Sequence, residues 1–316
     1  MANLTSGFFQ TLVAETVKAS EVLAPTWNAS QRIFWDYKPT EIGSIGQTIN
    51  VLIPNDPSNQ VADSGVGDLQ ITDVGFSQKS IAFNKHPQFA YTIRDFEQFN
   101  SPEIIRRVFV DAAFKAIKNY INASVANLFT TANFTTNSAI ACTASIPTLT
   151  QFTGALAVLA DQRVPVEDNP EEMTMLLPSV PYYAVQDASS TGGTAWTQAF
   201  IAGARTAEAV RQTGVMPVAF GTTFKLDQQM PITGSGTAHT YTGCLFHKYA
   251  VAGVSRPMAA PDTAVQFERV QFGDIELRVM MQYNLFPKQG WIVSIDAGYG
   301  LQVVRDNMGV LFTIAQ

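Results

Sequence analysis

The hydrophobic pattern of this 316-residue chain changes period several times along its length. Near the start, Phe9, Leu12 and Val13 recur at the spacing of a helix, and Pro25 would disrupt that helix if it continued. Residues 47–53 then alternate between apolar and polar, which is typical of a strand with one buried face. The pattern therefore predicts a short N-terminal helix followed by a strand.

A long two-stranded excursion is predicted next. Residues 54–69 are polar and rich in turn-forming residues, and two strand-like runs follow at residues 71–83 and 89–96. A two-stranded ribbon cannot bury both of its faces within one small domain. We therefore expect its apolar side chains to contact a neighbouring subunit. These side chains are Phe76, Ile81, Phe83, Phe89 and Tyr91.

Residues 101–129 predict one long helix. Ser101-Pro102-Glu103 is a favourable start, because serine can cap, proline suits the first helical position and glutamate favours the positive helix end. Apolar or small residues then recur with an i, i+4 spacing over roughly 43 Å of helix. The residues that we expect on the core face are Ile105, Phe109, Ile117 and Ile121. We expect this face to pack on strands near residues 275–279 and 303–311.

The second half of the chain mixes short helices and strands. The predicted elements are a helix at 149–162, a strand at 173–177, a short helix at 201–210, a strand at 222–226, a turn at 232–238 and strands across 245–314. Neither an internal repeat nor a long polar linker interrupts them. The predicted fold class is α+β.

The composition favours a structural protein over a protein that binds specific nucleic-acid sequences. The chain is 46% hydrophobic but only 15% charged, against roughly 25% charged in a typical globular protein. Extensive subunit contact and a large monomeric core explain this equally well. The net charge is −6, and no basic run exceeds Arg106-Arg107, so sequence-specific nucleic-acid binding is not expected. A mildly acidic protein can still enclose DNA without adhering to it.

Candidate chemistry is sparse. His86, His239 and His247 are far apart, and Cys142 and Cys244 are too few for a zinc site and read as buried free thiols. The glycine-rich stretches lack the pattern of a phosphate loop or a dinucleotide site. We therefore expect no enzyme: no catalytic residue, no cofactor and no metal ligand. The absence of a signal peptide and of an 18-residue apolar run predicts a protein made in the cytoplasm without a membrane partner.

Several segments carry a family resemblance. They are Arg163-Val164-Pro165 leading into residues 175–182, Arg211-Gln212-Thr213-Gly214 leading into residues 218–221, the run at residues 229–231, and the blocks at 245–252 and 294–305. With the long helix before them, their order resembles the major capsid proteins of tailed bacteriophages, which have the Hong Kong 97-like fold. The coat proteins of short-tailed phages are the most similar in character.

The resemblance implies a division of the chain. The implied parts are an N-terminal arm at 1–48, an extended β-hairpin loop at 49–98, a peripheral domain at 99–163 with its spine helix at 101–129, an axial domain at 164–243 and a return to the peripheral domain at 244–316. Some family members cross-link a lysine to an asparagine, and Lys79 and Lys85 lie in the corresponding loop. Most relatives do not cross-link.

The resemblance also implies a function. It is a structural protein that forms pentamers and hexamers of an icosahedral shell, assembled in the host cytoplasm and present in the virion. The shell would enclose double-stranded DNA without sequence-specific binding. Its partners would be a separate scaffolding protein, or none, a portal, and in some cases a decoration protein.

Two alternatives remain open from the sequence. One is an encapsulin-type shell protein of a bacterial nanocompartment. The other is a phage tail or receptor-binding protein, which the long helix disfavours. Neighbouring genes would separate the three: terminase and portal genes, a cargo enzyme, or tail genes.

Overall fold

The computed structural model is a mixed α+β molecule, which confirms the predicted class. It describes residues 9–14, 17, 29–54, 76–94, 109–142, 146–166, 172–190, 218, 220–235, 238–261, 265–285 and 289–315. The helical elements are η2 (Ser30–Arg32), α3 (Asp111–Ala126), α4 (Leu149–Asp161), α5 (Ser179–Ser190), η5 (Lys248–Ala250) and η6 (Asp306–Met308). The strands are β1 (Phe34–Tyr37), β2 (Thr48–Pro54), β3 (Phe76–Ala82), β4 (Gln88–Arg94), β5 (Ile140–Cys142), β6 (Met173–Leu177), β7 (Thr223–Leu226), β8 (Ile232–Ser235), β9 (Ala238–His247), β10 (Val251–Ser255), β11 (Gln266–Phe272), β12 (Ile275–Asn284), β13 (Gly290–Ala297), β14 (Tyr299–Val303) and β15 (Gly309–Ala315).

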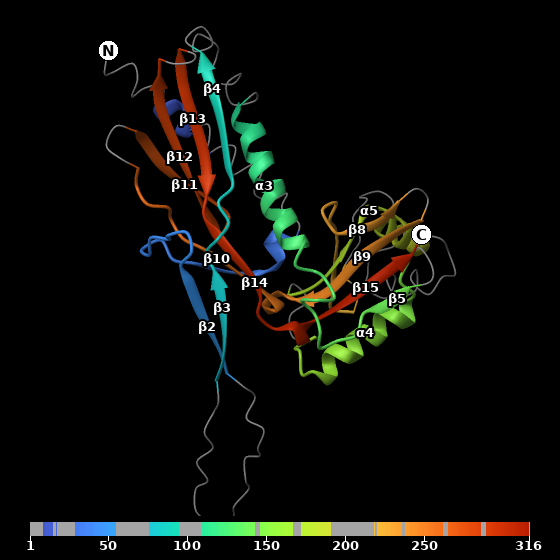
Figure 1. Ribbon diagram of the computed structural model, residues 1–316. Coiled ribbons are helices and arrows are strands. Elements are labelled where there is room, and N and C mark those ends of the chain that lie inside the picture. Colours follow the sequence, from blue (N-terminus) through green and yellow to red (C-terminus); the bar gives the residue numbers. More distant parts are fainter. Residues whose placement is uncertain are drawn as a thin grey trace, which may run out of the picture.

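Figure 1 shows two modules side by side and the hairpin of β2 and β3, which projects downward below the module on the left. The first module is the antiparallel sheet β11-β12-β13-β4, with α3 running along its β4 side. Alternate residues of β12, such as Leu277 and Val279, point into one core with Phe114, Ile117 and Ile121 of α3. The 3.6-residue period of the helix and the two-residue period of the strand thus meet at one apolar layer.

The second module is built on the six-stranded sheet whose main path is β5-β15-β9-β6-β7, with β8 paired to β9. All five residues of β6 are buried, as expected for a strand covered on both faces. Helix α4 packs Phe152, Ala155 and Leu159 into this core. It begins with a capping box, in which the Thr148 side chain accepts from the Gln151 backbone N–H and the Gln151 side chain accepts in return from the Thr148 N–H.

The hairpin is shorter than the sequence suggested. Strands β2 and β3 pair with each other, whereas β4 leaves the hairpin and pairs with β13 in the first module. The chain changes direction at Lys85, which exchanges two backbone hydrogen bonds with Tyr299 next to the root of the hairpin. The predicted excursion over residues 49–98 was therefore wrong beyond Ala82 among the described residues.

Other boundaries differ for local reasons. Helix α3 ends at Ala126 instead of residue 129, because Leu128 and Phe129 donate to carbonyls three residues back and close the helix with tight turns. Helix α5 and strand β8 were not predicted, and β8 occupies the expected turn at 232–238. The predicted helix at 201–210 and the start of the long helix at 101–108 lie outside the described residues.

Candidate assembly surfaces

Two hairpin residues that we expected at a subunit contact are buried by the chain itself. Ile81 and Phe83 are 0% and 1% exposed. Ile81 packs with Val254 and Val304, which lie outside the hairpin. Residues of the same chain therefore cover this side chain. No neighbouring subunit is needed to cover these two side chains, and that part of the expectation was wrong. The side chain of Phe76 lies outside the described residues.

Phe89 and Tyr91 lie on β4, not on the hairpin. Both are half-buried against the core beneath α3. The Tyr91 ring stacks on Phe109, with ring centroids 4.9 Å apart. Phe109 is itself half-buried against the same core. Contact of Phe89 and Tyr91 with a second subunit stays a prediction.

The described residues of the expected core face, Phe109, Ile117 and Ile121, all belong to the core of the first module. Ile117 and Ile121 are buried against Ile275, Leu277 and Val279, as the sequence predicted for the first set of strands. The second set, near residues 303–311, belongs to the core of the other module. Only the last turn of α3 reaches it, through Val125 and Ala126. Ile105 lies outside the described residues.

Several large apolar side chains remain uncovered. The most exposed are Leu52 at 64%, Ile45 at 61%, Leu285 at 60%, Ile42 at 58% and Tyr183 at 56%. Leu52 also lines a groove of about 360 Å³ at the root of the hairpin, together with the ring pair Phe34 and Tyr249. Single exposed apolar residues are ordinary, but an apolar groove beside a projecting ribbon is a surface that another chain can cover.

A buried arginine fixes the N-terminal segment to the body. Arg256 is 1% exposed, and its guanidinium group donates to the backbone carbonyls of Asp36 and Ser255. It also donates to the side-chain carboxylates of Asp36 and Glu41, at 3.2 and 3.1 Å. Strand β1 runs parallel to β10 at this point. Residues 34–41 are therefore held as part of the fold by one side chain more than 200 residues away.

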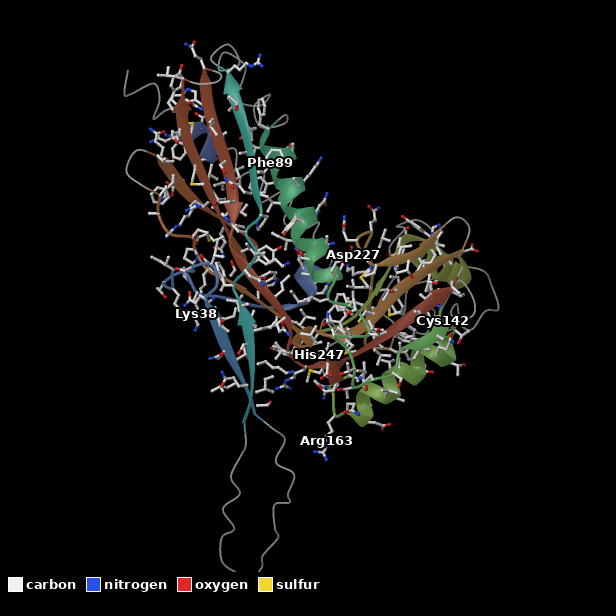
Figure 2. The ribbon with its side chains drawn as sticks, in the orientation of Figure 1. Lys38, Phe89, Cys142, Arg163, Asp227 and His247 are labelled. Atoms are coloured by element: carbon white, nitrogen blue, oxygen red, sulfur yellow. The ribbon has the colours of Figure 1, made fainter. Side chains whose placement is uncertain are left out.

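Asp227 joins three separate segments at the junction of the modules, where Figure 2 shows it next to α3. Its two carboxylate oxygens accept from the Asn122 amide at 2.9 and 2.8 Å, and from the backbone N–H groups of Ala29 and Gln229. Burial raises the pKa of the Asp227 carboxyl, and these donors oppose the rise. The arrangement positions the N-terminal segment, α3 and the strand β7 relative to one another.

A third anchor lies inside the first module. The buried carboxylate of Asp296 on β13 accepts from the Arg278 guanidinium through both oxygens, and its Oδ2 atom lies 2.9 Å from His86 Nε2. Because His86 precedes β4, this contact holds the segment that leads from the hairpin to the sheet. Sequence reasoning missed all three anchors, since each includes a contact across 198 or more residues of the chain.

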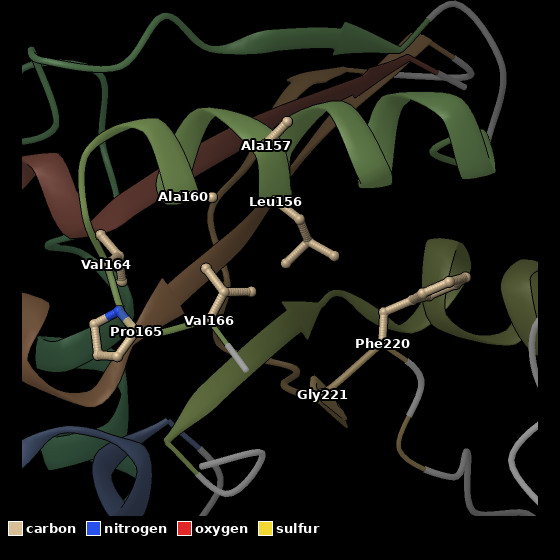
Figure 3. A pocket seen from close by; sticks show the side chains of 8 residues that line it. All are labelled: Leu156, Ala157, Ala160, Val164, Pro165, Val166, Phe220 and Gly221. Atoms are coloured by element: carbon tan, nitrogen blue, oxygen red, sulfur yellow. The ribbon is translucent and has the colours of Figure 1, made fainter. Parts of the chain in front are cut away.

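The described residues offer little for catalysis. The pocket of about 700 Å³ in Figure 3 lies between α4 and the segment around Phe220, and all eight lining residues are apolar or glycine. No group of three potential metal ligands occurs in the described part of the chain. Burial raises the pKa of the Cys142 thiol to about 11 and that of Cys244 well above its ordinary value, which makes both thiols poor nucleophiles at neutral pH.

None of the helices in the described ranges is long and apolar enough to cross a membrane. His247 is buried, and its Nε2 atom lies 3.2 Å from a carboxylate oxygen of Glu172. Burial lowers the pKa of His247, and Glu172 acts in the opposite direction. Glu172 directly precedes β6, and His247 ends β9 opposite Met173, the first residue of β6. The pair therefore has a packing role where these two strands meet in the second module.

Comparison with known proteins identifies the fold. Neither the protein-family models nor the curated proteins include a match to the sequence. Solved structures do match. A chain of Mycobacterium phage Che8 aligns with a TM-score of 0.57 at 14% identity, over 91% of each chain.

Two further structures agree. The capsid of cyanophage P-SCSP1u aligns with a TM-score of 0.57 at 14% identity, over 91% of this chain and 88% of that chain. The capsid of Ralstonia phage GP4 aligns with a TM-score of 0.54 at 10% identity, over 92% and 91%. Nearly the whole chain therefore has the fold of phage capsid proteins.

Proposed function

We propose that this protein is the major capsid protein of a tailed phage and that copies of it assemble into a closed shell. The observation that carries the proposal is the extent of the match, since about nine-tenths of this chain aligns with about nine-tenths of chains from phage capsids. The exposed apolar groove at the hairpin root supports it, because assembly would cover such a surface.

The modules suggest the parts of a Hong Kong 97-like subunit. In this proposal, β2 and β3 form the extended loop, and α3 with the sheet β11-β12-β13-β4 forms the peripheral domain. The six-stranded sheet forms the axial domain. Because β5, β9 and β15 all belong to that sheet, the axial domain would take in more of the chain than residues 164–243. The N-terminal arm would be anchored from Ala29 onward.

The proposed assembly defines the partners. Identical subunits would form pentamers and hexamers of an icosahedral shell around double-stranded DNA, in the virion, after assembly in the host cytoplasm. A scaffolding protein, a portal and a decoration protein are compatible additions. The role is structural and not enzymatic, and the apolar lining of the pocket beside α4 is in keeping with it.

Velocity sedimentation of the full chain, expressed alone and with its neighbouring genes, tests the proposal. We expect closed particles that sediment far ahead of the subunit, and nucleic acid in particles formed during infection. Particles that contain a co-encoded enzyme in place of DNA would establish the nanocompartment alternative. A chain that stays monomeric at all salt concentrations, with crowding agents and with the neighbouring gene products, would refute the proposal.

A further inference from the structure

Phe83 fills a socket whose walls are glycines. It directly follows β3 at the root of the hairpin, and it is 1% exposed. The tip of its ring lies against Gly43 and Gly298, which are far apart in the sequence. Gly300 lies in the same way against the backbone carbonyl of Ala82. These three glycines are called the glycine socket below.

The glycine socket has no room for a larger residue. A Cβ atom at Gly43 would lie 2.8 Å from Cζ of Phe83, and one at Gly298 would lie closer still. A Cβ atom at Gly300 would overlap the carbonyl oxygen of Ala82, which is a backbone atom and cannot rotate away. Carbon atoms pack at about 3.5–4.0 Å, so a side chain at any of these positions would displace the root of the hairpin.

Backbone hydrogen bonds hold the socket and the ring in place. The N–H of Gly43 donates to the carbonyl of Pro257 at 3.1 Å. The N–H of Phe83 donates to the carbonyl of Gln47 at 2.8 Å, and the Phe83 carbonyl accepts from the N–H of Gly46 at 2.9 Å. The position of the ring is therefore fixed from both sides by the fold.

A displacement at Phe83 is enlarged along the hairpin. Ile81, two residues earlier, is held by its packing with two valines outside the hairpin, so it acts as a pivot. Because a strand rises about 3.3 Å per residue, a shift of about 1 Å at Phe83 would turn β3 by about 9° and move Gln78 by about 1.5 Å. Leu52 pairs with Gln78 across the hairpin and lines the apolar groove, so it would move as well.

We propose that Phe83 and the glycine socket fix the direction in which the hairpin leaves the rest of the subunit, and that this direction sets the diameter of the shell. The inference rests on the proposed function, because the hairpin root is then the surface that a second copy of the chain covers. A symmetric shell repeats each contact, so one small change of angle acts at every copy of it. Phe83 is buried and acts through Leu52, as a positioning residue.

Distances between spin labels in unassembled full-length subunits test the direction of the hairpin. One label is attached through Gln78→Cys on β3. The second is attached through Gln282→Cys on β12 in one set of proteins and through Thr150→Cys on α4 in another. All three positions are exposed, and both native cysteines are buried. The two pairs measure displacement relative to each module.

Gly298→Ala is the test variant, because its Cβ atom would overlap the Phe83 ring. Gly154→Ala, within α4, is the matched control, since a Cβ atom there would meet nothing within 4 Å. Gly298→Ala/Phe83→Leu is the rescue variant, because leucine lacks the Cε1 and Cζ atoms that the new Cβ atom would meet. Gly43→Ala places a Cβ atom 2.8 Å from the same ring and serves as a milder second test variant. Circular dichroism and thermal unfolding establish which variants are folded.

We expect Gly298→Ala to change at least one label distance by about 1–1.5 Å. Gly154→Ala should keep both distances, and the rescue variant should return them towards the wild-type values. Electron microscopy should show particles of altered diameter from Gly298→Ala and of wild-type diameter from the control and the rescue variant. A merely structural role of Phe83 would lower the thermal midpoint or the particle yield without changing distance or diameter.

The two readouts separate the inference from the function on which it rests. Wild-type label distances in folded Gly298→Ala and Gly43→Ala subunits would overturn the inference. Shells of one diameter from all the variants would also overturn it and would leave the proposed function standing. The absence of shells from every protein would refute the proposed function and the effect on diameter, while the label distances would still decide whether the socket directs the hairpin.

Discussion

At the scale of single residues, the fold is fastened by buried polar side chains that bridge distant segments. Arg256 holds residues 34–41, Asp227 holds the segment that begins at Ala29, and Asp296 holds His86. Buried polar groups are costly unless they are fully hydrogen-bonded. Each anchor therefore favours one arrangement of segments over others, and its removal should lower the free energy of unfolding.

The variant Arg256→Met tests this role. Methionine keeps the apolar stem but leaves the carbonyls of Asp36 and Ser255 without their donor. We expect the free energy of unfolding to fall by about 1–3 kcal/mol for each buried group left unsatisfied. Urea denaturation of the subunit measures the loss. Glu41→Gln, which changes an exposed carboxylate on the same arginine, should cost less than about 1 kcal/mol. Equal costs would contradict the anchor.

His247 gives the subunit a predicted pH dependence. Burial holds the pKa of folded His247 below the unfolded value, so the folded state binds fewer protons than the unfolded chain. Its contribution to stability is present above about pH 6.5 and is lost as the pH falls through the folded pKa. The loss at pH 5 is limited to about 2 kcal/mol, which applies if folded His247 does not protonate at all.

Urea denaturation at pH 7 and pH 5 checks this sign. His247→Gln should show a smaller loss of stability between the two pH values than the wild type. Glu172→Gln removes the carboxylate that favours protonated His247, so its loss should be larger. The same pH dependence in all three proteins would exclude His247 as its source.

At the scale of elements, the long helix and the hairpin perform different tasks. Helix α3 buries Ile117 and Ile121 under the first sheet and extends Val125 into the second core. It therefore ties two modules together. The hairpin β2–β3 has one face on the body, through Ile81, and leaves Leu52 on the other exposed. It therefore presents an exposed apolar side chain that another chain can cover.

Ile121→Ala tests the helix. Ile121 is 0% exposed, so the truncation should cost about 2–5 kcal/mol, a large share of a typical stability of about 5–15 kcal/mol. Asn119→Ala, on the exposed side of α3, should change stability by less than about 0.5 kcal/mol. Thermal unfolding of the subunits compares them. An Ile121→Ala chain as stable as Asn119→Ala would contradict the packing.

Leu52→Asp tests the hairpin. The side chain is 64% exposed, so we expect the subunit to keep its far-ultraviolet circular dichroism and its thermal midpoint. Assembly should fail or fall at least tenfold in particle yield, because a charge would be buried without a partner at the contact. Gln282→Asp places the same charge on exposed β12 and should assemble normally. Unchanged particle yield from Leu52→Asp would remove the hairpin root from the interface.

At the scale of the whole molecule, the helices and strands were more predictable from the sequence than the segments against which they pack. Hydrophobic periodicity predicted the body of α3, as well as α4 and β6, because each buries its own regular face. Helix α5 was missed because Pro178 and Pro181 suggest irregular chain, although proline is tolerated in the first turn of a helix. A pattern along the chain indicates that a face is buried, but it does not say against what.

Long-range pairing explains the remaining errors. Strand β4 pairs with β13, about 200 residues later, and this pairing moves Phe89 and Tyr91 from the hairpin to the sheet. Asp227 and Arg256 likewise find their partners through the tertiary fold, across 198 and 220 residues.

Cryo-electron microscopy of particles formed by the full chain tests the central claim most directly. We expect closed icosahedral shells of pentamers and hexamers, in which a neighbouring subunit covers the groove lined by Phe34, Leu52 and Tyr249. The spine of each subunit should retain the packing of Ile117 and Ile121 seen in the isolated chain. Only monomers or irregular aggregates, under conditions in which the subunit is folded, would contradict the assignment of this protein as a shell subunit.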